Sequence, residues 1–460
     1  MLTNNNLVEL RSFFAGKKYY VRTYGCQLNE NDSEKISGIL DEQGMTNTDN
    51  INAASVIVFN TCTIRENAND KIFGNLGIVK GIKRKSPDVI VILCGCMMKE
   101  EHNVTKVKSK YKFVDLIFGP SDIYKLPALL FNRMNEGGLI CGIGDEDLII
   151  EDLPVTHKKK FRALSTIIYG CNNFCSYCIV PYVRGRERSR APEDVLKELK
   201  MLGDQGFKEV MLLGQNVNSY GKDFDSYDFA DLLSDASKID AISRIRFMTS
   251  HPKDTDRKLL DVMANGGNIM PHIHLPMQSG SDRVLALMNR KYSAGQYLDI
   301  VEYARKVIPD ISITTDIIVG FPGEKEEDFS ETLSLMERIR FDNAFTFMFS
   351  PRKGTPAADM DDQIPDDVMR ERFSRLVKLQ NKCTLESGMK TLNTVQTVLV
   401  EGLSQNSDKV YAGRTPHNRL VNFTCDKAIE EGDIVDVDIT SVKTFSLNGR
   451  FLSFNSGNGG

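Results

Sequence analysis

Three cysteines with the spacing Cys171-x-x-x-Cys175-x-x-Cys178 constrain this chain more than any other feature of its sequence. Three thiolates on one short loop match the ligands of a four-iron cluster, in which each thiolate binds one iron and the fourth iron stays open to a small molecule. A structural zinc site needs a fourth protein ligand. The loop holds no fourth cysteine, and the nearest histidine, His157, lies fourteen residues before it. The spacing therefore favours an iron–sulfur cluster with an open iron over structural zinc.

The length and composition indicate a soluble protein of two or three domains. The chain has 460 residues, more than one hydrophobic core usually supports. Its net charge of −4 excludes a protein that binds nucleic acid through its overall charge, so any RNA contact must come from local basic patches. No apolar run approaches the roughly 20 residues of a membrane span, and the first residues lack the features of a signal peptide. We therefore expect a cytoplasmic protein without membrane contact, whose cysteines are metal ligands or buried thiols rather than disulfides.

Residues 17–135 are predicted to form a doubly wound α/β domain. Three apolar runs alternate there with stretches of helical composition, and these runs are 18–25, 55–60 and 89–93. A βαβαβ order implies a parallel sheet with right-handed crossovers. A linker rich in glycine and acidic residues follows, over about 135–156.

A second group of cysteines is associated with this sheet. Cys26, Cys62 and Cys96 each stand within about two residues of the end of a predicted strand. Because the carboxyl ends of parallel strands share one edge of a sheet, we expect the three thiols to converge there as ligands of a second cluster. Cys94 competes with Cys96 for the third position, and Cys96 is preferred because it stands just beyond the strand, as the other two do. The alternative is that all three are small apolar core residues.

Six strand-like runs over residues 157–387 predict a partial parallel barrel of six βα units. The runs are 163–169, 208–213, 244–249, 272–276, 311–319 and 343–349. The active site of such a barrel lies at the carboxyl ends of its strands, where this sequence has mainly glycine, serine and amide residues. We therefore expect a ligand pocket there. His272 and His274 alternate along one strand, and we expect one of them to point into the barrel, as a hydrogen-bonded core residue rather than a ligand.

Four arginines follow the cluster loop at every second position: Arg184, Arg186, Arg188 and Arg190. In an extended segment they share one face, which suits contacts with the phosphates of an RNA. The alternative is a solvated strip, or ion pairs with nearby Glu187 and Glu193.

Residues 388–455 are predicted to form a small all-β barrel. The β-type runs are 394–400, 419–423 and 433–439. Over 388–456 there are seven Lys and Arg against eight Asp and Glu, so the domain is not basic overall. RNA binding depends on a local face with Arg414, His417 and Arg419, and a purely structural barrel is the alternative.

The cysteine loop, with Tyr177 before its last cysteine, resembles that of radical S-adenosylmethionine (SAM) enzymes. In that family the amino and carboxylate groups of SAM bind the open iron, and reduction cleaves SAM to methionine and a 5′-deoxyadenosyl radical. The resemblance implies that the barrel is a radical SAM core. The residues predicted to bind the cofactor are Tyr177, Gln215, Ser250, Gln278, Asp316 and Gly320.

Further motifs narrow the resemblance to the methylthiotransferase family. In the first domain they are Tyr24-Gly-Cys-Gln-Leu-Asn, Asn60-Thr-Cys-Thr-Ile-Arg-Glu-Asn and Cys94-Gly-Cys-Met. That family joins such an amino-terminal domain to a radical SAM core and a small TRAM domain, an RNA-binding module, and this architecture covers nearly the whole chain. Met98-Lys99 and Lys353 depart from the residues expected at those places, but neither departure affects a ligand.

The resemblance implies an enzyme that adds a methylthio group to carbon 2 of N6-(dimethylallyl)adenosine at position 37 of tRNA. It implies two 4Fe-4S clusters, one on Cys26, Cys62 and Cys96 and one on the loop cysteines. SAM is then both methyl donor and radical source. The expected partners are tRNA, an external electron donor and a sulfur or cluster donor.

Two alternatives stay open. One is the same chemistry on threonylcarbamoyl-adenosine in tRNA, or on an aspartate of a ribosomal protein. The other is an iron–sulfur protein that binds RNA or transfers electrons without SAM chemistry.

Overall fold

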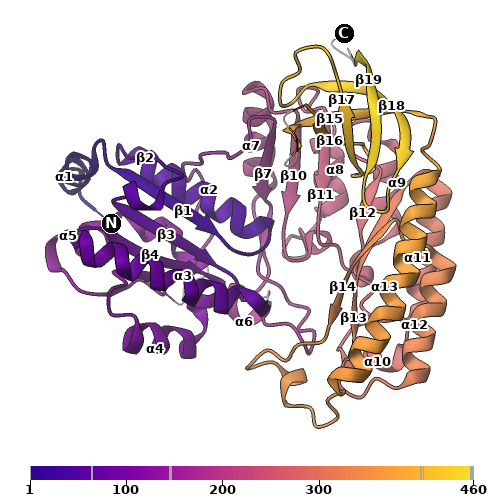
Figure 1. Ribbon diagram of the computed structural model, residues 1–460, viewed down its shortest axis with the longest axis horizontal. Coiled ribbons are helices and arrows are strands. Elements are labelled where there is room, and N and C mark those ends of the chain that lie inside the picture. The colour runs from indigo at the N-terminus through magenta and orange to yellow at the C-terminus, as the bar shows by residue number, and fades with distance from the viewer. Residues whose placement is uncertain (1, 64–65, 145–147, 405–406, 408, 456–460) are drawn as a thin grey trace. The chain divides into compact units, whose positions relative to one another are not determined.

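The computed structural model describes residues 2–63, 66–144, 148–404, 407 and 409–455 (Figure 1). The chain divides into two compact units. The first comprises Met1–Lys158, Tyr169–Asn172 and Ile179–Arg188, and the second comprises Lys159–Ile168, Asn173–Cys178 and Ser189–Gly460. Ile64 and Arg65 of the second cysteine motif, and residues 145–147 of the predicted linker, lie outside the described residues. None of the helices within the described ranges combines the length and apolar character needed to cross a bilayer.

The first unit contains a six-stranded parallel sheet with the strand order β2-β1-β3-β4-β5-β6. Its strands are β1 (Lys18–Thr23), β2 (Thr46–Asn47), β3 (Val56–Thr61), β4 (Ile90–Gly95), β5 (Leu116–Phe118) and β6 (Ile140–Cys141). The central strands β3 and β4 are buried along their whole length, as expected of parallel strands covered on both faces. The predicted doubly wound domain is confirmed.

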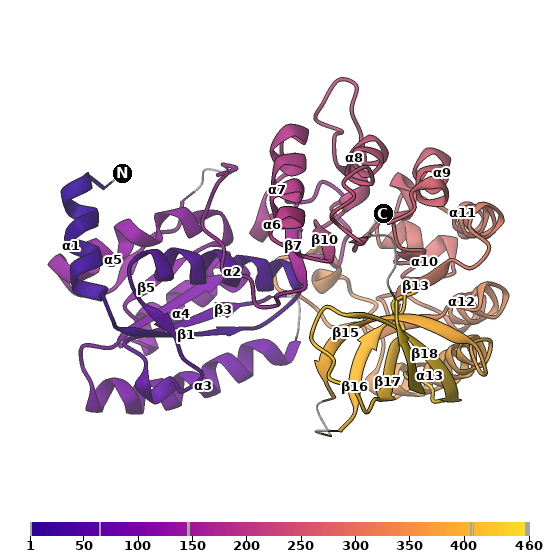
Figure 2. The same cartoon turned by 90° about the horizontal axis from the view of Figure 1, so that it is seen from above.

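Helices cover both faces of this sheet. They are α1 (Asn4–Phe14), α2 (Gln27–Glu42), α3 (Glu66–Lys85), α4 (Glu101–Lys110) and α5 (Leu126–Glu136). The short α6 (Val180–Arg184) packs instead against Cys96, just after β4. Figure 2 shows α2 and α3 on opposite faces. Because side chains alternate along a strand, Val58 packs in the core with α1, α2 and α5, and its neighbour Phe59 packs in the core with α3 and α4.

The second unit contains the predicted partial barrel of six parallel strands. They are β7 (Arg162–Thr166), β10 (Glu209–Leu213), β11 (Arg244–Phe247), β12 (His272–His274), β13 (Ser312–Val319) and β14 (Asn343–Met348). They pair in the orders β11-β10-β7 and β12-β13-β14. The two sheets meet where the amide of Ser250 donates to the carbonyl of His274 at 3.2 Å. The barrel prediction is confirmed.

Helices pack against the outer side of these strands (Figure 1). They are α7 (Pro192–Asp204), α8 (Phe229–Ala236), α9 (Arg257–Asn265), α10 (Asp282–Leu287), α11 (Ala294–Val307), α12 (Glu326–Ile339) and α13 (Asp366–Met389). Apolar residues of the strands and helices form one core between them, which fixes the strand ends in place.

A closed barrel follows α13, and we call it the terminal barrel. Its strands are β15 (Val395–Leu403), β16 (Tyr411–Arg414), β17 (Leu420–Thr424), β18 (Ile434–Val442) and β19 (Leu447–Phe454), in the order β15-β16-β17-β19-β18. Its core consists of valines and isoleucines, together with Phe423 and Leu447. The all-β prediction is confirmed.

Two buried arginines of β11 hold the terminal barrel against the larger one. The guanidinium of Arg244 donates to the carbonyl of Arg414 at 2.8 Å. That of Arg246 donates to the carbonyls of Thr415 at 2.8 Å and Pro416 at 2.9 Å. The turn between β16 and β17 is therefore bound through its backbone.

Candidate functional site

The first cysteine triplet lies at the carboxyl edge of the first sheet, after three neighbouring strands. Cys62 follows β3 directly, Cys96 follows β4 directly, and Cys26 begins the turn into α2 after β1. Gly25 has a φ of +124°, and a Cβ atom on it would lie 2.9 Å from the sulfur of Cys62. The backbone at position 25 thus comes so close to Cys62 that only glycine fits there.

The thiols of Cys94 and Cys96 have different surroundings. Cys94 lies in the core with α1, α2 and α5, with its sulfur 3.7 Å from the carbonyl of Phe59. The backbone turns at Gly95, which has a φ of +93°, and Cys96 packs instead against Ile179 and Val183. This arrangement favours Cys96 as the third ligand, which stays a prediction.

A polar network surrounds this triplet, and the sequence did not reveal it. Arg184 is buried, with Nε 3.2 Å from the sulfur of Cys96 and Nη2 2.8 Å from the carboxylate of Asp32. The amide of Asn29 donates to the carbonyl of Thr61 at 2.9 Å, and its oxygen accepts from the thiol of Cys26 at 3.5 Å. Asn29 and Asp32 follow Cys26 at intervals of three residues along α2. This helical spacing places them near the cysteine and could have been used to predict them from the sequence.

The residues present are compatible with an iron–sulfur cluster. No three His, Cys, Asp or Glu side chains in the described part of the chain converge as ligands of one metal ion. A four-iron cluster does not need such convergence, because each thiolate binds a different iron. Burial raises the pKa of Cys96 to about 12, while Arg184 opposes the shift. A thiol buried in this way becomes a thiolate when metal binds it.

The second triplet lies on the loop that contributes to both units. In the first unit, the amide of Cys171 donates to the carbonyl of Gly185 at 3.1 Å. In the second unit, the segment after α10 holds the loop: Asn289 donates to the carbonyl of Phe174 at 2.8 Å, and Arg290 Nη1 lies 3.6 Å from the sulfur of Cys175. Arg290 is buried and is a second site residue that sequence reasoning missed.

Buried polar atoms without a hydrogen-bond partner gather at the carboxyl ends of the barrel strands. Among the described residues these include Ser165 Oγ, Asn216 Oδ1, Asn218 Oδ1, Ser250 Oγ and Gln278 Oε1. Buried polar groups are normally paired. Several unpaired ones at one edge therefore mark a place where a polar ligand can supply the missing bonds.

The backbone at this edge is also unusual. Thr249 and Gln278 follow β11 and β12 with φ values of +70° and +66°. A positive φ is rare for residues other than glycine and is often found at ligand sites. Of the predicted cofactor residues, Ser250 and Gln278 lie here among the unpaired atoms, while Gln215 follows β10 and is partly buried.

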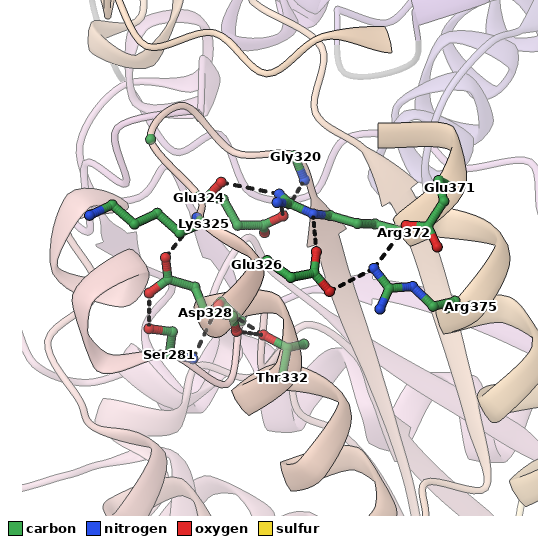
Figure 3. Close-up of polar contacts among 12 residues, drawn as sticks. Ser281, Gly320, Glu324, Lys325, Glu326, Asp328, Thr332, Glu371, Arg372 and Arg375 are labelled. Atoms are coloured by element: carbon green, nitrogen blue, oxygen red, sulfur yellow. Dashed lines mark hydrogen bonds and ion pairs between the residues drawn. The ribbon is translucent and has the colours of Figure 1, made fainter. Parts of the chain in front are cut away.

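The remaining predicted cofactor residues lie on β13, on the loop after it and on the cysteine loop. Asp316 is on β13, and the amide of Gln278 donates to its carbonyl at 2.8 Å. Gly320 begins the loop after β13, where its amide donates to the carboxylate of Glu324 at 3.0 Å (Figure 3). The ring of Tyr177 lies edge-on to that of Phe321, with the ring centres 6.5 Å apart.

Both histidines of β12 point into the barrel, and the expectation that only one does so was wrong. The rings of His272 and His274 lie 3.1 Å and 3.0 Å from the hydroxyl of Thr314. Residues two apart on a strand share one face, which explains the result. His274 also lies 3.3 Å from the carboxylate of Asp316.

Comparison with known proteins identifies the family. The radical SAM superfamily model matches residues 165–336, the TRAM domain model matches 390–452, and the model of uncharacterized protein family UPF0004 matches 18–119. The tRNA-2-methylthio-N(6)-dimethylallyladenosine synthase of Acetivibrio thermocellus is 51% identical over 95% of this chain and 92% of its own length. The enzyme of the same name from Alkaliphilus oremlandii is 49% identical over 96% and 95%.

The chain belongs to the tRNA-2-methylthio-N(6)-dimethylallyladenosine synthase family. The predicted resemblance is thereby confirmed. The fold is also similar to that of radical SAM methyltransferase TsrM from Kitasatospora setae, solved with cobalamin and a 4Fe-4S cluster bound, with a TM-score of 0.55 over 75% of this chain and 74% of that chain. At 12% identity this likeness shows the fold alone.

In this member of the synthase family, the four arginines after the cysteine loop do not share one extended face. Arg184 ends α6 and is buried against Asp32, and Arg190 is buried with Nη1 2.5 Å from Glu198. The premise of an extended strip is wrong, because Val180–Arg184 is helical. Arg186 is exposed and Arg188 partly so, and their RNA contacts stay a prediction.

The two arginines predicted to bind RNA in the terminal barrel line one cavity of about 310 Å³. Arg414 Nε lies 3.2 Å from Glu401, and Arg419 Nη2 lies 2.8 Å from Asp342. The same cavity is lined by His417, Lys443, Phe345 and Phe445.

Proposed function

We propose that this protein adds a methylthio group to carbon 2 of N6-(dimethylallyl)adenosine at position 37 of tRNA, giving 2-methylthio-N6-(dimethylallyl)adenosine. The observation that carries the proposal is that both cysteine triplets stand in a chain 51% identical, over 95% of its length, to an enzyme named for that product. We prefer this substrate to threonylcarbamoyl-adenosine or a ribosomal aspartate, because the relatives carry the name of the dimethylallyl product.

The proposed cofactors are two 4Fe-4S clusters and SAM. Three ligands for each cluster come from the two triplets, Cys26, Cys62 and Cys96 in the first unit and Cys171, Cys175 and Cys178 in the loop. When bound, the clusters and SAM supply the radical, sulfur and methyl group that an unreactive aromatic carbon requires. Arg184 and Arg290 each place a buried cation beside one thiol of a triplet, which offsets the negative charge of the thiolates.

SAM is proposed to bind at the carboxyl ends of the barrel strands. The unpaired oxygens of Ser250 and Gln278 are available for its polar groups, and the amide of Gln215 and the carboxylate of Asp316 lie at the same edge. Gly320 lets a ligand approach the backbone there. An iron–sulfur protein without SAM chemistry has no need for this set of unpaired polar atoms, which argues against that alternative.

Three domains are proposed, at 17–135, 157–387 and 388–455. The segments matched by the three family models, 18–119, 165–336 and 390–452, fall inside them and support this division.

The tRNA is proposed to dock on basic groups in both units. In the first unit these are Arg186 and Arg188. In the second unit the cavity beside the terminal barrel combines Arg414, Arg419 and Lys443 with the exposed ring of Phe445. Cations beside aromatic rings suit an RNA, whose phosphates and bases need these two kinds of contact. An electron donor and a sulfur or cluster donor complete the proposed partners, and the cytoplasm is the proposed location.

The test is an anaerobic assay of reconstituted protein with SAM, a reductant and either isopentenylated or unmodified tRNA. We expect 5′-deoxyadenosine together with the methylthio nucleoside, detected by mass spectrometry of digested tRNA, from the isopentenylated substrate only. Methylthiolation of a different tRNA or of ribosomal protein would move the proposal to another substrate. Absence of 5′-deoxyadenosine from cluster-loaded protein would reject SAM chemistry.

A further inference from the structure

The loop after β13 is tied to helix α13 by a buried ion pair (Figure 3). One carboxylate oxygen of Glu324 accepts from the amide of Gly320 at 3.0 Å and from Arg372 Nη1 at 2.9 Å. The same Nη1 donates to the backbone carbonyl of Glu324 at 3.1 Å. Arg372 therefore binds both the side chain and the backbone of one loop residue, and through the carboxylate it fixes the start of the loop at Gly320.

This pair is buried, with 4% of Glu324 and 6% of Arg372 exposed. Burial raises the pKa of Glu324, while Arg372 and the amide of Gly320 oppose the shift. A buried ion pair is expensive to desolvate and adds little net stability. A geometric role, holding one conformation of the loop, accounts for it better.

A second contact between α13 and the loop depends on shape. Gly320 has a φ of +75°, and a Cβ atom on it would lie 2.2 Å from the Cγ of Met369. Met369 and Arg372 are three residues apart, so they project from the same side of the helix. The backbone of the loop thus packs directly on α13, next to the ion pair.

On its other side, the loop after β13 packs near the loop that carries the second cysteine triplet. Phe321 is fully buried in a small core with Met288 and Phe349, against which Tyr177 packs. The Met288 carbonyl accepts from the amide of Ser176, between two of the cysteines, at 3.0 Å. A displaced Gly320–Glu324 loop would therefore disturb the contact surface of the cysteine loop.

We propose that Arg372 is a positioning residue for SAM. It holds the Gly320–Glu324 loop in the one conformation that presents the backbone after β13 to the cofactor and supports Tyr177. Arg372 lies on α13, beyond the segment 165–336 matched by the radical SAM family model. The inference rests on the proposed function, because SAM is the ligand assumed at this edge. A loop held in its bound conformation loses less freedom on binding, so affinity is gained without a direct contact.

The test compares reconstituted Arg372→Lys enzyme with the wild type and with Arg375→Lys. Arg375 is a matched control, since it lies one turn further along α13 and pairs at 2.8 Å with both Glu326 and Glu371. Lysine at 372 keeps the charge but replaces the planar guanidinium, which binds Glu324 through Nη1 and Glu326 through Nε at 3.2 Å, by a single ammonium that cannot reach both residues in this geometry. We expect the SAM KM for 5′-deoxyadenosine formation to rise about tenfold in Arg372→Lys, as when one charge-assisted hydrogen bond is lost. Iron content should be unchanged, and Arg375→Lys should stay within about twofold of the wild type.

A double variant separates positioning from simple charge balance. Arg372→Met with Glu324→Gln removes both charges but keeps an oxygen that accepts from Gly320. If Arg372 only neutralises Glu324, this variant recovers both the thermal stability lost in Arg372→Met and the SAM KM, and the proposal is overturned. If stability recovers while the SAM KM stays raised, the positioning role is supported.

A wild-type SAM KM in Arg372→Lys would also overturn the proposal. Failure on the proposed tRNA substrate gives a different pattern. In that case the wild type cleaves SAM without methylthiolating tRNA, and the comparison at Arg372 still holds because it is read from 5′-deoxyadenosine.

Discussion

The Nε atom of Arg184 lies 3.2 Å from the sulfur of Cys96. Asp32 holds the guanidinium in place at 2.8 Å. In the second triplet Arg290 has the matching place, 3.6 Å from the sulfur of Cys175. Each proposed cluster therefore has one buried cation beside one of its thiols. Charge and hydrogen bonds to sulfur set the reduction potential of a cluster, so these two arginines are expected to tune the two potentials.

Replacing Arg184 by glutamine should affect the cluster proposed on Cys26, Cys62 and Cys96, which we call the auxiliary cluster. It should become harder to reduce, because a positive charge beside it is lost. We expect the midpoint potential to fall by about 60 mV, equivalent to about 1.4 kcal/mol for a one-electron couple. A redox titration followed by electron paramagnetic resonance measures it. Arg186→Gln is the control, since that side chain is exposed. Equal potentials in both variants would contradict the tuning role.

The two triplets should bind iron independently. Replacing Cys171, Cys175 and Cys178 together by alanine should leave about half of the iron and abolish 5′-deoxyadenosine formation, because each four-iron cluster has its own ligands. Iron analysis and a SAM-cleavage assay check this. Loss of all iron from folded protein would show that the clusters depend on each other.

Cys96 and Cys94 should behave differently as alanine variants. Cys96→Ala should lose the auxiliary cluster, because its sulfur faces Arg184. Cys94→Ala should keep the iron and lose only about 1 kcal/mol of stability, as expected for a small truncation in a core. Iron content and thermal unfolding are the measurements, and the reverse pattern would assign the third ligand to Cys94.

Docking of tRNA should depend on Arg186, Arg188 and Arg414. Each alanine variant should weaken binding about equally for different tRNA sequences and lower the salt slope of log K by about one if the side chain contacts a phosphate. Arg338→Ala is the control, an exposed arginine that pairs with Glu302 on the outer helices. Affinities measured at several salt concentrations, with an unchanged slope in all three variants, would place the RNA elsewhere.

Stability should fall as the pH drops below about 6.5, the ordinary pKa of histidine. Burial lowers the pKa of His251 and His272 in the folded protein. Between the two pKa values the unfolded chain binds protons that the folded one does not, so acid favours unfolding by up to about 1.4 kcal/mol per pH unit for each histidine. His272→Gln keeps a hydrogen-bonding group near Thr314 but does not titrate. Its melting temperature should therefore fall less than that of the wild type between pH 7 and pH 5.5.

The sequence was sufficient for the parts of the fold that depend on local pattern. Apolar runs located β1, β3 and β4 and the six barrel strands, because buried parallel strands are continuously hydrophobic. The strands β2 and β6 have only two residues each and carry no such signal. The cysteines were located by spacing and by their places after strands.

Contacts between distant segments were beyond the reach of sequence pattern. The alternation of arginines after the cysteine loop predicts an extended backbone that presents Arg184 to RNA, whereas Pro181 lies in the first turn of a short helix that ends at Arg184. Its partner Asp32 is 152 residues away in the chain. Arg290 meets Cys175 across 115 residues, and Arg372 meets Glu324 across 48. Such pairs arise only when the strands and helices have packed.

The hydrogen bonds from Arg244 and Arg246 to the turn between β16 and β17 determine whether the terminal barrel can be separated from the rest of the second unit. A chain cut near residue 388 would keep both buried guanidinium groups but lose their carbonyl acceptors. Weaker tRNA binding by such a truncated chain would therefore reflect its misfolding rather than the loss of an RNA-binding module. Every residue type has a carbonyl, so these three contacts depend on the path of the turn and not on its side chains. The terminal barrel is thus not simply removable, and transplanting it onto another enzyme would require the two arginines to move with it.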